Sequence, residues 1–268
     1  MKLWLREEFA KEWQEQDPFA CADQLEGKVY RALEGRKTLR FELSGNSYFI
    51  KIHKGIGWGE IVKNLTQGRL PILGAGAEYR AINRLHELGV DTMTAAAFGE
   101  RGVNPATQQS FLVTEDLAGS ISLEDFCGNW QEQPPKLKLK RALIKKVATI
   151  SAQLHNHGVN HRDYYICHFH LYPESLQEDH DNIRLHVIDL HRTQLRNRTP
   201  YRWRLKDLAG LYFSAMDVGL TRGDRLCFLK HYFQSSLKMV IRDQEKLLSD
   251  VERKAQALYE REQRKRRG

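Results

Sequence analysis

Residues 160–165 read NHRDYY, and residues 185–191 read LHVIDLH. In the first stretch a polar turn centred on Asp163 follows a run with helical periodicity, and in the second Asp189 follows a short apolar run typical of a strand. Enzymes of phosphoryl transfer present a catalytic base and then a metal-binding carboxylate in this order. Either acid alone is a weak signal, so this interpretation depends on the rest of the chain.

Two further charged residues stand in the order that phosphoryl transfer needs. A cation must hold the nucleotide phosphates, and a carboxylate must hold that cation. Lys51 lies on the third strand of a predicted antiparallel meander over 28–33, 38–43 and 48–52, and Glu78 opens a helix predicted over 77–88. A lone strand lysine usually reaches into solvent, and an acid in a first turn often only offsets the helix dipole. The coincidence of all four residues favours the functional interpretation.

The remaining pattern predicts an α+β fold. Two more strands fit near 95–98 and 111–115, the first 25 or so residues suggest helix and turn, and residues 54–77 suggest an irregular glycine-rich segment. Helical periodicity dominates beyond Leu117, over 138–157, 206–216 and from about 238. We expect two lobes, a sheet-rich nucleotide-binding lobe over 1–117 and a mainly helical catalytic and acceptor-binding lobe over 118–268.

The composition is that of an ordinary globular protein. The chain has 268 residues, 41% hydrophobic and 28% charged. No apolar run approaches the ~20 residues of a transmembrane helix, and charge appears directly after Leu5, too early for a secretory signal. Four cysteines are scattered without a C-x-x-C pair, which favours reduced thiols. We therefore expect a cytoplasmic protein.

The charge balance is basic and unevenly distributed. Lys and Arg number 42 against 34 Asp and Glu, a net charge of +8, which suggests an anionic partner. Residues 192–206 contain basic side chains and no acid. Because this run directly follows Asp189, it points to an anionic substrate more than to a merely solvated surface.

Four longer blocks, at residues 51–60, 69–75, 158–169 and 187–192, resemble the lipopolysaccharide core heptose(I) kinases of Gram-negative bacteria, which have a bilobal protein-kinase-like fold. The resemblance implies ATP-dependent phosphorylation of the first inner-core heptose on a Kdo–lipid A acceptor, with Mg²⁺. It also implies the following roles: Asp163 as base with Arg162 beside it, Lys51, Glu78 and Asp189 on the nucleotide, and Asp189 with His168 on the metal.

The sequence departs from the protein-kinase pattern in two respects. No G-x-G-x-x-G loop joins the first strands, so we expect the hairpin backbone or residues 55–59 to cover the nucleotide phosphates. His168 stands five residues after Asp163, where protein kinases carry an asparagine. Imidazole is a poor ligand for Mg²⁺, so Asp189 is expected to carry most of the metal binding. Asp207 resembles the buried aspartate that holds the H-R-D turn.

The basic residues suggest where the acceptor and partners bind. Arginine pairs well with phosphates and carboxylates, and we expect Arg192, Arg196, Arg198 and Arg202 to contact the inner-core glycolipid. A basic surface also suits the anionic inner membrane, to which we expect peripheral association, and an acidic carrier protein. The resemblance makes acyl carrier protein a plausible partner.

Two other functions stay open from the residues alone. A small-molecule kinase of the antibiotic phosphotransferase type would share the fold, but its polycationic acceptors would be repelled by residues 192–206. A basic nucleic-acid-binding protein would explain the net charge, but no recognisable motif of that class occurs, so we expect no nucleic acid.

Overall fold

The computed structural model describes residues 1–33, 35–67, 73–176, 180 and 182–267. The predicted turn residue Glu34 and residues 69–72 of the 69–75 block lie outside these ranges. Packing separates two units, one made of residues 1–84, 93–118 and 190–192, the other of residues 85–92, 119–189 and 193–268. The single lobe boundary after residue 117 stays a prediction.

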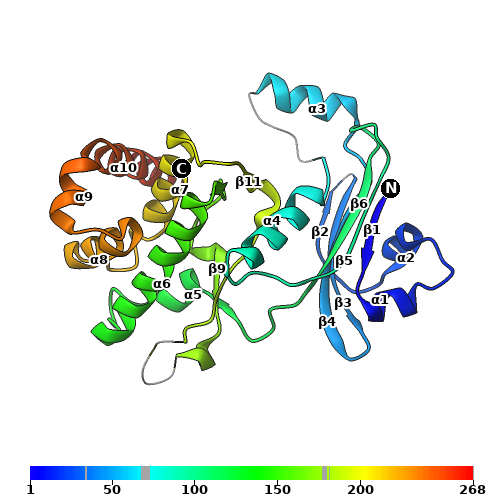
Figure 1. Ribbon diagram of the computed structural model, residues 1–268, viewed down its shortest axis with the longest axis horizontal. Coiled ribbons are helices and arrows are strands. Elements are labelled where there is room, and N and C mark those ends of the chain that lie inside the picture. The colour runs from blue at the N-terminus through cyan, green and yellow to red at the C-terminus, as the bar shows by residue number, and fades with distance from the viewer. Residues whose placement is uncertain (34, 68–72, 177–179, 181, 268) are drawn as a thin grey trace. The chain divides into compact units, whose positions relative to one another are not determined.

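The first unit is built on a six-stranded antiparallel sheet with the order β1-β5-β6-β4-β3-β2 (Figure 1). The predicted meander and the two later strands are confirmed. The strands are β1 (Lys2–Leu5), β2 (Lys28–Leu33), β3 (Arg36–Leu43), β4 (Asn46–His53), β5 (Ala95–Arg101) and β6 (Gln109–Glu115).

Strand β4 shows how the sheet orients Lys51. Successive side chains of a strand point to opposite faces, and Tyr48, Ile50 and Ile52 are buried in the main core of this unit. That core also contains apolar side chains of the short helices α1 (Glu7–Glu12) and α2 (Pro18–Gln24), which cover this face of the sheet. Lys51 therefore points to the other face, where α4 (Gly76–Glu87) lies.

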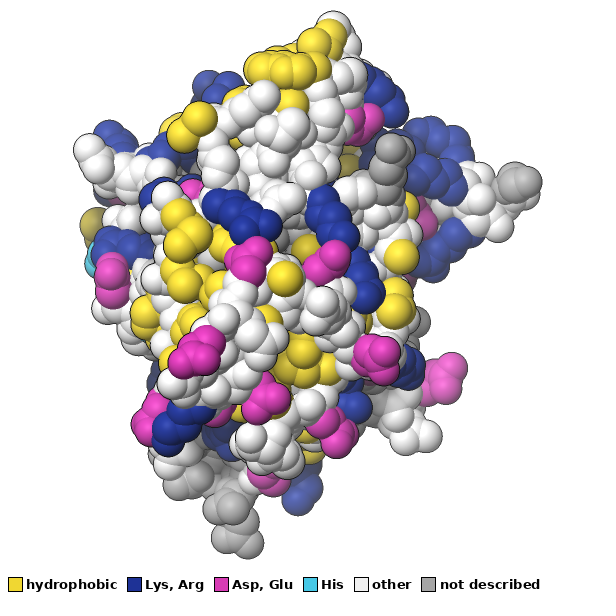
Figure 2. Space-filling model, turned by 90° about the vertical axis from the view of Figure 1, so that its right-hand side faces the viewer, with side chains coloured by type: hydrophobic (Ala, Val, Ile, Leu, Met, Phe, Trp, Pro, Cys, Tyr) yellow, Lys and Arg dark blue, Asp and Glu magenta, His cyan; other side chains and the backbone are white. Residues whose placement is uncertain are grey.

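Two segments of the first unit differ from the prediction. Helix and turn were expected over the first 25 or so residues; α1 and α2 confirm the helical part. The first residues differ, because β1 forms a strand by pairing with β5, which is far away in the sequence. The 54–77 segment, expected to be irregular, contains α3 (Gly57–Thr66), whose two early glycines mask its helical pattern. Trp58, Val62 and Leu65 of α3 are exposed. Helix α3 lies at the top of Figure 1, and hydrophobic side chains are visible at the top of Figure 2, which is turned about the vertical axis.

The second unit is mainly helical. Its helices are α5 (Leu123–Cys127), α6 (Leu137–Asn156), α7 (Tyr201–Ser214), α8 (Arg222–Phe233), α9 (Leu237–Asp243) and α10 (Glu245–Arg267). The helix predicted over 138–157 is confirmed as α6. The helix predicted from residue 206 begins earlier, directly after Pro200, a residue that suits a helix start. Helix α8 was not predicted. The expected α+β fold is confirmed.

Short strands in the second unit bring the two quoted stretches together. The strands β7 (Ile121–Ser122), β9 (Phe169–Leu171) and β10 (Leu185–Val187) form one small sheet, and β8 (Val159–Asn160) pairs with β11 (Gln194–Leu195). Asp163 thus follows β8, and Asp189 follows β10. Among the described residues no helix is both long and apolar enough to span a membrane.

Candidate active site

The first unit presents an ion pair between Lys51 and Glu78. Lys51 Nζ lies 2.7 Å from Glu78 Oε1, so the predicted contact between the third strand and the following helix is present. The Glu78 side chain is 2% exposed and the Lys51 side chain 29%. A buried carboxylate is costly without a cation. Glu78 therefore fixes the position of Lys51, whose side chain stays partly exposed.

A buried aspartate holds the turn before Asp163 in the second unit. The carboxylate of Asp207, on α7, accepts hydrogen bonds from the backbone N–H groups of His161 at 2.7 Å and Arg162 at 2.8 Å. Arg162 has a φ of 76°, in the left-handed region that a non-glycine residue keeps only when its surroundings enforce it. The structural contact predicted for Asp207 is confirmed, and it fixes the backbone that leads into Asp163.

The histidine of the same turn ties it to the segment that carries Asp189. His161 Nε2 lies 2.8 Å from the carbonyl oxygen of Ile188. Burial lowers the pKa of His161, so its ring is neutral and donates a hydrogen from Nε2. Asp189 itself has a φ of 60°. This part-buried hydrogen bond links the turn of Asp163 to that of Asp189, and each turn contains one residue with a positive φ, Arg162 and Asp189.

His168 lies between the two acids. Its Nδ1 is 2.7 Å from the backbone carbonyl oxygen of Asp163, and its Nε2 is 3.5 Å from Asp189 Oδ2. A carbonyl oxygen only accepts hydrogen bonds, so Nδ1 carries a hydrogen, and Nε2 is the ring atom that can offer a lone pair to a metal. A nitrogen donor atom and a carboxylate oxygen therefore stand together, both partly exposed.

This pair of side chains fits a divalent cation in a nucleotide site. Cations of phosphoryl transfer use one or two protein ligands and complete their shell with phosphate oxygens and water. The described ranges contain no group of three or more His, Cys, Asp and Glu residues that could hold a metal alone. Asp189 and His168 would hold the cation together with a nucleotide. The imidazole makes the site better suited to Mn²⁺ than a set of oxygen ligands would be.

Two of the four predicted acceptor arginines lie at one tryptophan ring. The guanidinium groups of Arg196 and Arg202 lie 5.8 and 4.9 Å from the ring centre of Trp203. Arg198 is exposed. Arg192 ends the short turn η3 (Leu190–Arg192), which belongs to the first unit. Trp203 was not predicted as a site residue, although a tryptophan amid arginines is a visible signal for cation–π contacts.

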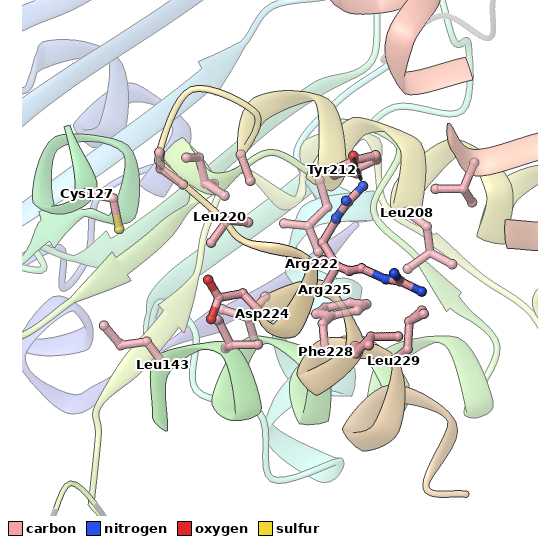
Figure 3. A pocket seen from close by; sticks show the side chains of 18 of the residues that line it. Cys127, Leu143, Leu208, Tyr212, Leu220, Arg222, Asp224, Arg225, Phe228 and Leu229 are labelled. Carbon is pink, nitrogen blue, oxygen red and sulfur yellow. Dashed lines mark hydrogen bonds between the residues drawn. The ribbon is translucent and has the colours of Figure 1, made fainter. Parts of the chain in front are cut away.

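The second unit also contains an apolar cavity of about 370 Å³ that was not predicted from the sequence (Figure 3). Its lining includes Leu143 of α6, Leu208 of α7 and Phe228 of α8. Two arginines, Arg222 and Arg225, stand in this lining, and Arg225 Nη1 donates a hydrogen bond to the Tyr212 hydroxyl at 2.8 Å. Helical periodicity predicts which face of a helix is buried, but not whether the side chains of neighbouring helices fill the space between them.

Known proteins resemble this chain over almost its whole length. The profile of the Lipopolysaccharide kinase (Kdo/WaaP) family matches residues 21–232. The chain is 57% identical over 264 residues to the lipopolysaccharide core heptose(I) kinase WaaP of Pseudomonas aeruginosa, covering 98% of each chain. It is 50% identical over 262 residues to the protein of the same name from Escherichia coli K12, covering 97% of this chain and 98% of the other.

A solved structure is similar to the same extent. It is described as WaaP in complex with acyl carrier protein, and it matches with a TM-score of 0.85 and 52% identity, covering 97% of this chain and 100% of that chain.

Proposed function

The chain belongs to the lipopolysaccharide kinase (Kdo/WaaP) family, and from that premise we propose how it works as a phosphotransferase. It transfers the γ-phosphoryl group of ATP to a hydroxyl of the first inner-core heptose of lipopolysaccharide. The observation that carries the proposal is the hydrogen-bonded frame of His161, His168 and Asp207, which holds the turns of Asp163 and Asp189.

Asp163 is the base of this reaction. As the heptose oxygen bonds to the γ-phosphorus, its hydroxyl proton passes to the Asp163 carboxylate, and the bond between that phosphorus and the β–γ bridging oxygen breaks to release ADP. Arg162 supports the turn from which Asp163 acts. The Asp207 contacts supply the positional precision that such a transfer needs.

Lys51, Glu78 and Asp189 bind the nucleotide. Lys51 pairs with the phosphates and keeps its orientation through Glu78. Asp189, with His168 beside it, would hold the divalent cation, which when bound neutralises charge on the phosphate oxygens. Aminoglycoside-like acceptors are disfavoured because the residues around Trp203 would repel a polycation.

The direct test is phosphate transfer from labelled ATP to purified, dephosphorylated core glycolipid in the presence of Mg²⁺. We expect transfer by the unmodified chain and a fall in turnover of about 10²–10⁴-fold in Asp163→Ala, with ATP affinity nearly unchanged. Asp163→Asn keeps the shape of the side chain but cannot accept the proton, so it tests the loss of the base without a change in packing. Near-normal turnover in both variants would show that Asp163 is not the base.

Acyl carrier protein is the proposed protein partner. Its support is the solved complex of a relative together with the apolar cavity, whose walls suit an acyl chain and whose Arg222 and Arg225 suit an acidic carrier. Each methylene group buried there contributes about 0.8 kcal/mol. A carrier protein that binds the folded chain and not the unfolded chain should raise the melting temperature.

The test compares carrier protein with and without a long acyl chain. We expect the acylated form to raise the melting temperature more, and Leu143→Trp, which fills the cavity, to abolish the difference. Lys254→Gln removes a charge from the exposed side of α10 and is the control. Equal stabilisation by both forms of the carrier would mean that the cavity does not take the acyl chain.

Peripheral contact with the anionic inner membrane completes the proposal. It is supported by the net charge of +8 and by the exposed Trp58, Val62 and Leu65 of α3, since short amphipathic helices with tryptophan insert into the membrane interface. Co-sedimentation with vesicles of anionic lipid should fall in Trp58→Ser and with added salt. Binding that is insensitive to both changes would argue against this contact.

A further inference from the structure

Four cationic side chains surround a single indole ring in the second unit. The charged groups of Arg162, Arg196, Arg202 and Lys206 lie 5.0, 5.8, 4.9 and 5.7 Å from the ring centre of Trp203. We call these five residues the Trp203 cluster. Energetically significant cation–π contacts occur about once per 70–80 residues, so four cations at one ring suggest a role beyond packing.

The cluster is assembled from segments that tertiary structure brings together. Trp203, Arg202 and Lys206 lie on α7, Arg162 follows β8, and Arg196 follows β11. The β8–β11 pair continues to Gly158, where a Cβ would lie only 1.7 Å from the Arg196 carbonyl oxygen. The close approach of these backbones therefore needs a glycine, and it places Arg196 beside the turn of Asp163.

Arg196 is held in place without being neutralised. Its guanidinium donates hydrogen bonds to the side-chain oxygens of Asn160 at 2.6 Å and Gln194 at 2.8 Å. Both acceptors are neutral amides, so they orient the group and leave its charge uncompensated. Burial and the neighbouring Arg202 lower the pKa of Arg196. This direction agrees with like charges that are crowded around the ring.

The start of α7 adds to the positive potential. Helix N-termini carry a partial positive charge and usually have a capping side chain or acids in the first turn. Here Pro200 makes no side-chain cap, and the first turn contains no acid and carries Arg202. At 0.1 M salt the Debye length is about 10 Å, so the repulsion within the cluster is only partly screened.

We propose that the Trp203 cluster binds an acidic group, a phosphate or a carboxylate, of the acceptor whose hydroxyl Asp163 deprotonates. This rests on the proposed function, because it assumes an anionic glycolipid as acceptor. Arginine presents paired N–H groups that match both acids, and a bound anion relieves the repulsion between Arg196 and Arg202. Arg162 adjoins Asp163 in the chain, so the anion positions the acceptor beside the base.

The competing explanation is that the cations only pack against Trp203 and stabilise α7. The two explanations differ in what a lost charge does. If the cluster binds an anion, Arg202→Gln and Lys206→Gln weaken acceptor binding and leave ATP binding intact. If it is structural, the same changes lower the melting temperature and leave acceptor binding intact.

Binding is measured on the full-length chain with Asp163→Ala, so that no turnover is needed. Inorganic phosphate serves as the probe, followed by tryptophan fluorescence, with Trp203→Phe identifying the part of the signal that comes from this ring. We expect phosphate to compete with dephosphorylated core glycolipid. Arg202→Gln and Lys206→Gln should each weaken glycolipid binding about tenfold or more, as the loss of a charge-assisted hydrogen bond implies.

The control is Lys254→Gln, which removes one exposed positive charge of the same unit outside the cluster. If Lys254→Gln and Arg202→Gln weaken glycolipid binding equally, the anion is attracted by the overall positive charge and not by a specific site, which would overturn the inference. A change in the affinity for ATP, with the affinity for glycolipid kept, would assign the anion to the nucleotide and also overturn the inference.

The outcome can be separated from the proposed function. If the active chain phosphorylates the glycolipid and the cluster variants keep its KM, the inference fails and the function stands. If glycolipid is not phosphorylated but phosphate binding still depends on Arg202 and Lys206, the anion site stands without that acceptor.

Discussion

The Nε2 atom of His168 lies 3.5 Å from Oδ2 of Asp189. Nδ1 of His168 donates a hydrogen bond to the backbone carbonyl oxygen of Asp163, so Nε2 is the ring atom that can bind a cation together with the carboxylate. Because nitrogen ligands favour Mn²⁺ over Mg²⁺ relative to oxygen ligands, we expect His168→Asn to reduce the preference for Mn²⁺ about tenfold.

The readout is Mn²⁺ binding by electron paramagnetic resonance with a non-hydrolysable ATP analogue, with Mg²⁺ as competitor. His168→Ala, which removes the ligand without replacing it, should weaken both metals. If His168→Asn has the same metal preference as the unmodified chain, His168 only holds the Asp163 backbone and does not bind metal.

A second prediction concerns the buried partner of Lys51. Lys51→Met leaves the carboxylate of Glu78, which is 2% exposed, without this cation, so it should lower the free energy of unfolding by about 2–3 kcal/mol. The double variant Lys51→Met, Glu78→Gln removes the charge as well and should recover much of that loss. Urea unfolding of both single variants and the double variant measures the coupling; additive losses would mean that the two groups do not interact.

The Asp207 contacts give a third prediction. Asp207→Ala leaves the N–H groups of His161 and Arg162 without this acceptor, and hydrogen bonds to a charged group contribute about 1.5–3 kcal/mol each. We expect a lower urea midpoint and a lower kcat, because the Arg162 backbone relaxes away from its positive φ. Asp207→Asn still offers one acceptor oxygen, so its urea midpoint and kcat should lie between those of the unmodified chain and of Asp207→Ala. An unchanged kcat in Asp207→Ala would show that this turn does not affect catalysis.

The sequence predicts best the features that depend on local pattern. Alternation along residues 48–52 is enough to place Lys51 on the face opposite the core, and helical periodicity identifies α4 and α6. The contact from Asp207 to the H-R-D turn came from resemblance, since residues 163 and 207 are joined only by the tertiary fold.

The features that escaped prediction depend on partners far away in the sequence. Strand β1 exists because β5 pairs with it, and the cavity exists because α6, α7 and α8 leave space between their apolar faces. The run over 192–206 predicted an anionic ligand, but not that Arg196 and Arg202 share Trp203 with Arg162. That sharing follows from the β8–β11 pairing.

The last prediction concerns stability below neutral pH and depends on His53, at the end of β4. His53 is buried, and burial, helped by the charges of Arg36, Lys51 and His191, lowers its pKa from 6.5 to about 4. Between these values the unfolded chain binds a proton that the folded chain does not, so stability rises with pH across this window. Above pH 6.5 both states are neutral and the effect vanishes, whereas near pH 5 this residue alone should cost about 2 kcal/mol.

Urea unfolding of the unmodified chain and of His53→Gln, near pH 7 and near pH 5, measures this cost. The unmodified chain should lose about 2 kcal/mol more than the variant on acidification. Burial also lowers the pKa of His161, His170 and His186, but these residues titrate in both proteins, so the difference between the two isolates His53. An equal loss in both would mean that His53 takes up its proton in the folded state as readily as in the unfolded one.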